Sequence, residues 1–286
     1  CPHCDIALTF HKKENILSCH LCNHQITPTK TCPSCKSDSC LKFKGTGTEL
    51  IQASLNKIFP QIRTLRIDRD TTSQKHSHDK LLKEFRSGKA DVLIGTQMIV
   101  KGLHFPSVTL VGVLNSDGAL NIPDFRSGET VFQLITQVAG RAGRSYLPGE
   151  VVIQTFMPDN SIIKFASKQD YDGFYEQEIQ ARDYFNYPPF SQIVKFVFSG
   201  KCENDVINIC SNFRAKIIKK LTNDFNIHPT IPCGHAKIKD HFRYQFLIRG
   251  KKINLLTNII NQTKKEFTIP SSINFLVDID PLSTFF

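Results

Sequence analysis

The sequence predicts an α/β fold in several parts, and three observations carry that prediction. Seven of the ten cysteines lie within the first 40 residues, where few apolar residues accompany them. Over 41–160, short apolar runs alternate with amphipathic helical segments. After the Pro188-Pro189 pair, longer strand and helix patterns follow in a different order. We therefore expect a cysteine-rich module, an α/β domain and a C-terminal α+β domain.

The region 41–160 has the pattern of strands connected by helices. We expect strands at 62–67, 91–95, 108–114 and 151–155, and helices at 49–59, 78–87 and 129–139. Pro60 and Gly88 follow the first two helices and are typical stop signals. Short, mostly apolar strands that alternate with helices are typical of a parallel sheet covered on both faces.

The C-terminal part follows a helical linker at 161–190, which is rich in Asp, Glu and Tyr. Beyond it we expect, in chain order, a strand at 191–199, a helix at 203–222, strands at 230–236 and 242–249, a helix at 251–266 and a strand at 273–279. This βαββαβ order predicts a split βαβ, ferredoxin-like arrangement. The expected parts are 1–40, 41–160, 161–190 and 191–286.

Charge and hydropathy narrow the class of protein. The 286-residue chain carries 36 Lys and Arg against 26 Asp and Glu, a formal net charge of +10. This excess suits a partner that carries phosphates, although a basic surface without such a role is the alternative. No run approaches the roughly 18 apolar residues of a spanning helix, and no signal peptide opens the sequence. We expect a cytoplasmic protein without membrane contact and, because Cys1 stands first, a fragment of a longer one.

Six of the N-terminal cysteines form three C-x-x-C pairs: Cys1/Cys4, Cys19/Cys22 and Cys32/Cys35. Zinc takes four ligands in a tetrahedron, and one C-x-x-C turn supplies two thiolates. The first two pairs, joined by 14 residues, therefore predict a complete structural Zn²⁺ site. A redox dithiol is the alternative.

The third pair, Cys32 and Cys35, forms half of a site. Its partners could be an upstream pair lost with a missing N-terminal half, or Cys40 together with a histidine such as His20 or His24. A disordered second site is the third explanation, and we favour the lost upstream pair. The remaining cysteines lack ligand spacing and are expected to be small buried residues: Cys202, Cys210 and Cys233.

The segment 137–144 has the form Q-x-x-G-R-x-G-R. Two arginines three residues apart on a helix share one face, so Arg141 and Arg144 can point together across a cleft. A guanidinium beside the phosphoryl charge of a transition state accelerates ATP hydrolysis by roughly 10³–10⁵-fold. Gly140 allows close approach of the backbone, and Gln137 lies one turn earlier, where it could orient water. A helix that binds DNA phosphates, or is simply solvated, is the alternative.

Further motifs occur around this box: GTGTE (45–49), RIDRDTT (66–72), IGTQMIVKGLHFPSVTLVGVLNSDGAL (94–120), DFRSGE (124–129), YPPF (187–190), FRYQFLIRG (242–250) and VDIDP (277–281). Together with the CPHC, CHLC and CPSC pairs, they resemble the PriA family of replication-restart DNA helicases over essentially the whole chain. The resemblance implies a RecA-like second helicase lobe of superfamily 2 with a Cys-rich zinc-binding insertion. The chain departs from the family pattern at Asn115, Thr130 and Lys36, the last standing where a glycine is common.

The resemblance also implies roles for individual residues. Those roles are catalytic for Arg141, Arg144 and Gln137, nucleotide-binding for Lys101, Gly102, Asp117 and Gly140, and DNA-binding for Thr96, Gln97 and Arg243. On the bare sequence, Asp117 is more typical of a turn. Arg243 belongs to a set of basic residues that could bind DNA or could equally form an ordinary solvated face. The other members are Lys237, Lys239, Arg249, Lys251 and Lys252.

Two motifs that ATP hydrolysis requires are not in the sequence. There is no G-x-x-x-x-G-K-[ST] phosphate loop and no D-E-x-H or D-E-x-D box. These motifs hold the triphosphate and magnesium. We expect the first RecA-like lobe and the N-terminal DNA-binding domains to be missing, so that ATP and Mg²⁺ bind only to the full-length protein. The chain alone should then hydrolyse ATP at background rate.

The leading hypothesis is the C-terminal half of an ATP-dependent 3′-to-5′ DNA helicase that restarts stalled replication forks. The resemblance implies as partners forked or single-stranded DNA, the missing lobe, single-strand-binding protein and other primosome proteins. The alternative is a non-motor, zinc-ribbon nucleic-acid-binding module with a degenerate RecA-like lobe. A degenerate lobe should have lost its arginine pair, and this chain retains both arginines.

Overall fold

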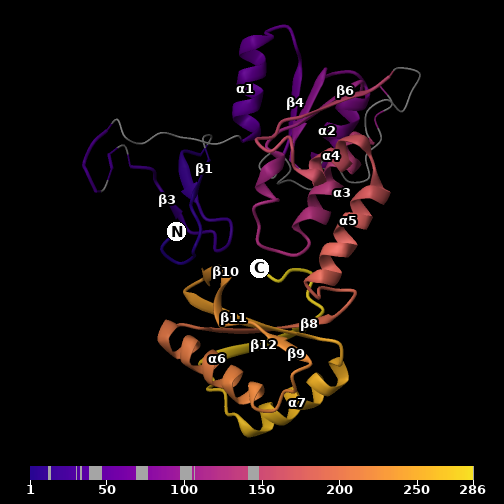
Figure 1. Cartoon of the computed structure of the whole chain (residues 1–286). Helices are drawn as coiled ribbons and strands as arrows, with labels where there is room; N and C mark the ends of the chain where they lie inside the picture. The colour runs from indigo at the N-terminus through magenta and orange to yellow at the C-terminus, as the bar shows by residue number, and fades with distance from the viewer. Residues whose placement is uncertain are drawn as a thin grey trace. The chain divides into compact units, whose positions relative to one another are not determined.

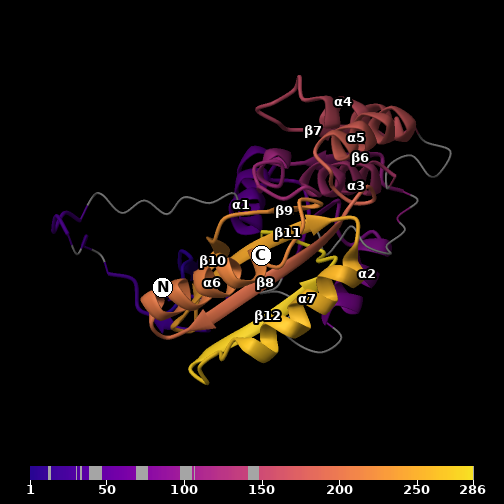
Figure 2. The ribbon, with the colours of Figure 1, turned by 60° about the horizontal axis from the view of Figure 1, so that its bottom comes forward.

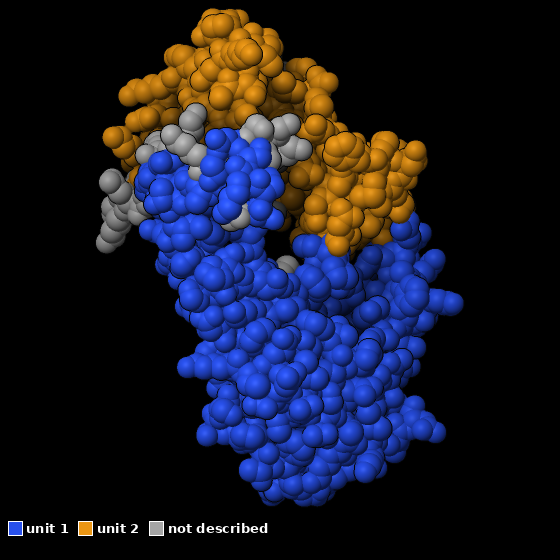
Figure 3. Space-filling model, turned by 90° about the vertical axis from the view of Figure 1, so that its left-hand side faces the viewer, with its two compact units in different colours: residues 1–41, 122–127, 175–286 blue, residues 42–121, 128–174 orange. Residues whose placement is uncertain are grey.

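The computed structural model describes residues 1–11, 14–29, 31–32, 34–38, 47–68, 77–96, 105, 107–140 and 148–285. The chain folds into two units, shown as a ribbon in Figure 1 and in two colours in Figure 3. Unit 1 comprises residues 1–41, 122–127 and 175–286, and unit 2 comprises residues 42–121 and 128–174. None of the helices in the described residues is both long and apolar enough to span a membrane.

The first half of unit 2 has helices and strands in alternation. They are α1 (Thr48–Ile58), β4 (Thr64–Ile67), α2 (Ser77–Arg86), β5 (Val92–Gly95), β6 (Leu110–Val113) and the 3₁₀ turn η2 (Ser116–Gly118). The strands pair in parallel, β4 with β5 and β6 with β7 (Glu150–Ile153), as predicted. Every element predicted over 41–160 is confirmed with bounds within two residues.

The sheet of unit 2 differs from the expectation in two respects. Within the described residues the two strand pairs form separate two-stranded sheets rather than one. The β6–β7 pair also leaves Leu110 and Val152 62% and 52% exposed, so the described residues do not cover both of its faces. These strands are only four residues long and alternate between exposed and half-buried positions.

The predicted linker begins with core residues of unit 2. It contains α4 (Ser161–Lys168) and α5 (Tyr171–Tyr184), separated by Gln169 with a φ of 55°. The Asn160 side chain caps α4 by accepting a hydrogen bond from the Ile162 amide. These helices pack on α3 (Ser127–Ala139) through a buried cluster: Val131, Phe132, Ile135, Ile163, Ala166 and Phe174.

The C-terminal part of unit 1 is a sheet with two helices on one face (Figures 1 and 2). Its elements are β8 (Gln192–Gly200), α6 (Glu203–Ile218), β9 (Phe225–Ile227), β10 (Ile231–Ile238), β11 (His241–Gly250), α7 (Ile253–Glu266) and β12 (Ile273–Ile279). All the predicted elements are present, and only β9 was not foreseen. The strand order is β10-β11-β8-β12 with every neighbour antiparallel, and β9 pairs with β11.

Aromatic residues form the centre of this part. Phe196 of β8 stacks on Phe246 of β11, with ring centroids 4.5 Å apart. Phe213 of α6 and Leu256 of α7 are fully buried in the same cluster. Alternate residues of β8 therefore face the helices, which is why its apolar pattern was readable in the sequence.

The N-terminal module is small and has almost no apolar core. Its strands β1 (Thr9–His11), β2 (Ile16–Ser18) and β3 (Gln25–Ile26) form an antiparallel sheet. Among its described residues only Cys4, Ser18 and Cys19 are buried. A module of this size needs a cross-link or a metal to remain folded.

Candidate functional sites

The four cysteines of the first two C-x-x-C pairs come together, as predicted. The Sγ atoms of Cys1, Cys4, Cys19 and Cys22 lie within 4.8 Å of one another, and those of Cys1 and Cys22 are 3.5 Å apart. None of the described cysteines forms a disulfide. Four thiolates around one Zn²⁺ at 2.3 Å would be separated by roughly 3.8 Å. The residues therefore fit a zinc ion, and four protein ligands leave no position for a substrate.

The backbone around the second pair is shaped to present both sulfurs. The Asn23 amide donates to the Cys19 carbonyl at 2.9 Å, and the Cys19 amide donates to the His24 carbonyl at 2.9 Å. Asn23 follows Cys22 with a φ of 63°, a left-handed conformation that asparagine tolerates. Desolvation alone would raise the pKa of the Cys19 thiol, but backbone hydrogen bonds from Cys22 and Leu21 lower it to about 7. A thiol with this pKa readily becomes the thiolate that binds metal.

The third pair has the same local backbone. The Lys36 amide donates to the Cys32 carbonyl at 2.9 Å, and the Cys32 amide donates to the Ser37 carbonyl at 3.1 Å. Lys36 has a φ of 59°, which explains why a glycine suits this position. In the described part of the chain, Cys32 and Cys35 do not join His20 or His24 in a cluster of three or more potential ligands. Cys40 lies outside the described residues.

The remaining cysteines divide into two groups. Cys210 and Cys233 are buried, as predicted, and burial raises the pKa of the Cys210 thiol to about 12. The prediction is wrong for Cys202, which is exposed as the N-cap residue of α6. A position at the start of a helix faces solvent, and the residues that follow Cys202 are polar: Glu203, Asn204 and Asp205.

Half of the predicted catalytic, nucleotide-binding and DNA-binding residues lie outside the described residues. These are Gln97, Lys101, Gly102, Arg141 and Arg144. Of the others, Thr96 is exposed directly after β5, and Gln137 is exposed on the last turn of α3. The Gly140 amide donates to the Thr136 carbonyl at 2.9 Å, which closes that turn.

Asp117 is buried in η2, at the end of the loop that follows β6. Its carboxylate accepts hydrogen bonds from the Thr155 hydroxyl and, at 2.7 Å, from the Phe156 amide. Beside it, Ser116 donates to the Gln154 carbonyl. Asp117 therefore joins the loop after β6 to the segment after β7.

Arg243 is half-buried on β11, and its guanidinium donates to the His235 carbonyl at 3.4 Å. Its basic neighbours are also engaged within the protein. Lys237 contacts the Pro2 carbonyl and Asp240, and Lys252 pairs with Asp224 at 2.8 Å. These contacts leave the assignment of Arg243 to DNA binding as a prediction.

Sequence reasoning missed Asp124. Its carboxylate accepts hydrogen bonds from the Ser283 hydroxyl at 2.8 Å and from the Thr284 amide at 2.7 Å, and further bonds from the Phe285 and Arg126 amides. Asp124 thus fixes the segment 283–285 to the segment 122–127 within unit 1. The DFR motif was visible in the sequence, but nothing in it indicated partners some 160 residues away.

Comparisons with known proteins agree with this geometry. Residues 1–26 match the PriA DNA helicase Cys-rich region, residues 14–146 match the helicase conserved C-terminal domain, and residues 183–282 match the primosomal protein N C-terminal domain. The chain belongs to the PriA DNA helicase family. It is a mixed α/β protein that combines a helicase C-terminal domain with a Cys-rich zinc-ribbon region.

Relatives in the PriA family match along the whole chain. The replication restart protein PriA of Chlamydia muridarum is 50% identical over 100% of this chain and 38% of its own length. The Bacillus subtilis and Borreliella burgdorferi proteins of the same name are 42% and 35% identical, over 98% and 99% of this chain and 35% and 42% of their own lengths. The chain thus spans about two fifths of the length of these curated relatives.

Proposed function

We propose that this chain supplies the second motor lobe, the zinc module and the C-terminal domain of an ATP-dependent 3′-to-5′ DNA helicase that restarts stalled replication forks. The observation that carries the proposal is the match of residues 14–146 to a helicase C-terminal domain. That segment ends on the QVAGRAGR box. Arg141 and Arg144 would stabilise the phosphoryl charge, and Gln137 would orient the attacking water.

The nucleotide would lie between this lobe and a first lobe that supplies the phosphate loop and the magnesium ligands. Lys101, Gly102, Asp117 and Gly140 would line this lobe's side of that site. Asp117 would act by holding the loop after β6, because its carboxylate already binds Thr155 and Phe156. Full-length relatives named PriA support an arrangement in which this chain is one part of a larger motor.

The chain by itself should not turn over ATP. With no phosphate loop in its sequence, it has no group that can hold the triphosphate against the arginines. We expect background hydrolysis by the purified chain with or without forked DNA, and DNA-stimulated hydrolysis by the full-length protein in the same assay. DNA-stimulated ATP hydrolysis by the chain alone would refute the proposal that another lobe must hold the triphosphate.

The partners would be forked or single-stranded DNA, single-strand-binding protein and other primosome proteins, all within the cytoplasm. Thr96 and Gln97 would contact the DNA backbone from the lobe, and Arg243 from the C-terminal domain. The net charge of +10 supports a phosphate-bearing partner. A non-motor nucleic-acid-binding module is the second candidate, and the retained arginine pair argues against it.

The proposed division of the chain is 1–40, 41–160, 161–190 and 191–286. The strand order β10-β11-β8-β12, with all neighbours antiparallel and two helices on one face, supports a ferredoxin-like C-terminal domain. The parallel pairs β4–β5 and β6–β7 support a RecA-like lobe. Zn²⁺ would be structural, with ATP and Mg²⁺ bound by the full-length protein.

A further inference from the structure

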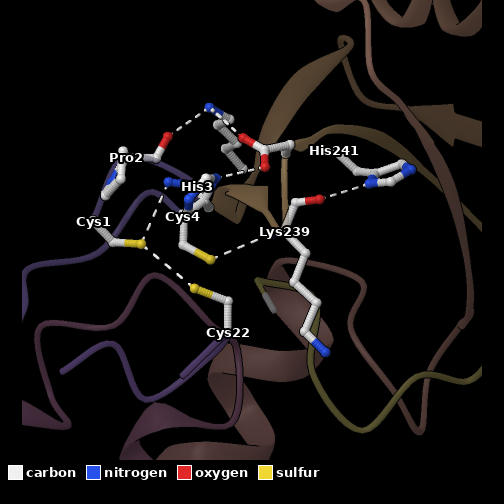
Figure 4. Close-up of polar contacts among 9 residues, drawn as sticks. Cys1, Pro2, His3, Cys4, Cys22, Lys239 and His241 are labelled. Atoms are coloured by element: carbon white, nitrogen blue, oxygen red, sulfur yellow. Dashed lines mark hydrogen bonds and ion pairs between the residues drawn. The ribbon is translucent and has the colours of Figure 1, made fainter. Parts of the chain in front are cut away.

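The turn between β10 and β11 lies against the first C-x-x-C knuckle (Figure 4). The Lys239 amide donates to the Cys4 Sγ at 3.3 Å, and the Asp240 amide donates to the His3 carbonyl at 2.8 Å. The Asp5 amide donates in return to the Lys237 carbonyl at 2.8 Å. These backbone contacts join segments about 235 residues apart, and all of them lie within unit 1.

Side chains reinforce the same contact. The His3 Nδ1 lies 2.6 Å from the Asp240 Oδ2, and the Lys237 Nζ donates to the Pro2 carbonyl at 2.9 Å. Lys237 also pairs with Asp240 at 3.3 Å, which holds both side chains over the knuckle. The turn therefore contacts Pro2, His3 and Cys4 in succession.

The conformation of the turn is unusual for its sequence. Ile238 pairs with His241, so Lys239 and Asp240 form a two-residue hairpin loop. Their φ values are 50° and 61°, a combination that normally selects Asn-Gly or Asp-Gly. A lysine in this region is disfavoured, and surrounding contacts must maintain it. The bonds to His3 and Cys4 are such contacts, and the left-handed turn directs the Lys239 amide at the sulfur.

The Lys239 amide can stabilise the negative charge on the Cys4 sulfur. Cys4 is only 3% exposed, and four thiolates around one Zn²⁺ leave two net negative charges. An N–H group aimed at a thiolate sulfur stabilises that charge and so favours the metal-bound state. Outer-shell hydrogen bonds of this kind typically change metal affinity by about 10–100-fold.

We propose that the β10–β11 turn is an outer-shell element of the zinc site, so that metal retention by the N-terminal module depends on its docking to the C-terminal domain. The coupling is reciprocal: if docking of the module strengthens zinc binding, zinc binding must strengthen docking by the same free energy. Loss of zinc should therefore loosen residues 237–241. This inference does not depend on ATP hydrolysis or DNA unwinding.

The rate of zinc release into excess chromogenic chelator tests the proposal. The chain would carry Cys32→Ser and Cys35→Ser, so that only the cluster of Cys1, Cys4, Cys19 and Cys22 is followed. In that background we expect Lys237→Ala with Asp240→Ala to speed release by about 10-fold or more. Asp224→Ala is the matched control, because this exposed carboxylate pairs with Lys252 in the same domain but away from the module. Equal release rates in all three proteins would overturn the proposal.

A second measurement needs no substitution. Hydrogen exchange of the wild-type chain is compared before and after removal of zinc. We expect the amides of residues 237–241 to lose protection on zinc removal, while those of α7 keep it. Unchanged protection at residues 237–241 would contradict the coupling, even if the double variant failed to fold.

Discussion

At the scale of single residues, Asp124 makes several hydrogen bonds to the segment 283–285 that the sequence motifs did not predict. Burial raises its pKa, but hydrogen bonds from the Arg126 amide, Ser283 and the following backbone amides outweigh burial and lower the pKa overall. The charged carboxylate thus stabilises the folded state. It does so by fixing 283–285, whose carbonyls in turn accept from Lys195 and Gln245 of the sheet.

We expect Asp124→Asn to lower the free energy of unfolding of unit 1 at pH 7 by about 1–3 kcal/mol, the cost of losing a charged acceptor. Because the folded pKa lies below the unfolded value of about 3.9, this contribution is present above that pH. It is lost as the pH falls through the folded pKa. The difference in unfolding midpoint between wild type and variant should therefore shrink from pH 7 to about pH 3.

Asp183→Asn provides the control, because this carboxylate is exposed on α5. It should leave the midpoint unchanged at both pH values. The difference in unfolding midpoint between Asp124→Asn and wild type could instead stay constant or grow at acid pH. That result would show that the charged carboxylate does not stabilise the fold.

At the scale of elements, two of the three C-x-x-C knuckles, Cys19/Cys22 and Cys32/Cys35, have the same backbone hydrogen bonds. Each first cysteine accepts from the amide of the residue after the second cysteine, and that residue, Asn23 or Lys36, has a positive φ. Such a turn presents two sulfurs to one metal. We propose on this basis that the knuckle of Cys32 and Cys35 also binds metal, although within the described residues it belongs to no cluster of three or more potential ligands.

We expect the full-length protein to bind two zinc ions and Cys32→Ser with Cys35→Ser to bind one, counted by native mass spectrometry. The second site would take its other ligands from a part of the full-length protein outside this chain. Cys210→Ser is the control, because Cys210 is buried in the C-terminal core and should leave the count unchanged. One zinc ion in both the wild type and the double variant would contradict a second site.

Local patterns determined which elements could be predicted. The helices and strands of 41–160 and 191–286 were readable because their apolar periodicity lies within each segment. The three residues of β9 are too few for any periodicity, and the break at Gln169 depends on a left-handed residue with no glycine signal. The linker was expected to be separate from the lobe because sequence does not reveal that Phe174 stacks on Phe132.

The functional sites, like the elements, were predictable only where the signal is local in the sequence. The cluster of Cys1, Cys4, Cys19 and Cys22 was predictable because the ligand spacing is short and chemically specific. The contacts of Asp124 with Thr284 and of Lys239 with Cys4 were not, because both donors are backbone amides, which carry no signature of residue type. Long-range backbone contacts are therefore where structure adds most to the sequence.

At the scale of the whole molecule, we propose a motor component with a metal-stabilised module docked on its C-terminal domain. The helicase C-terminal match and the PriA relatives support the motor, and the four clustered cysteines support the metal. In this proposal, Arg141 and Arg144 act on a triphosphate presented by another lobe. A binding module with a similar fold would make no use of them.

The most direct test is the DNA-stimulated ATP hydrolysis rate of the full-length protein carrying Arg144→Ala. We predict that kcat falls by roughly 10³–10⁵-fold, because the guanidinium acts on the transition state. Affinity for forked DNA should remain close to that of the wild type. Lys89→Ala, which removes an exposed positive charge after α2, should leave both quantities unchanged. An Arg144→Ala protein that hydrolyses ATP at the wild-type rate would contradict the assignment of this chain as the arginine-bearing lobe of a helicase.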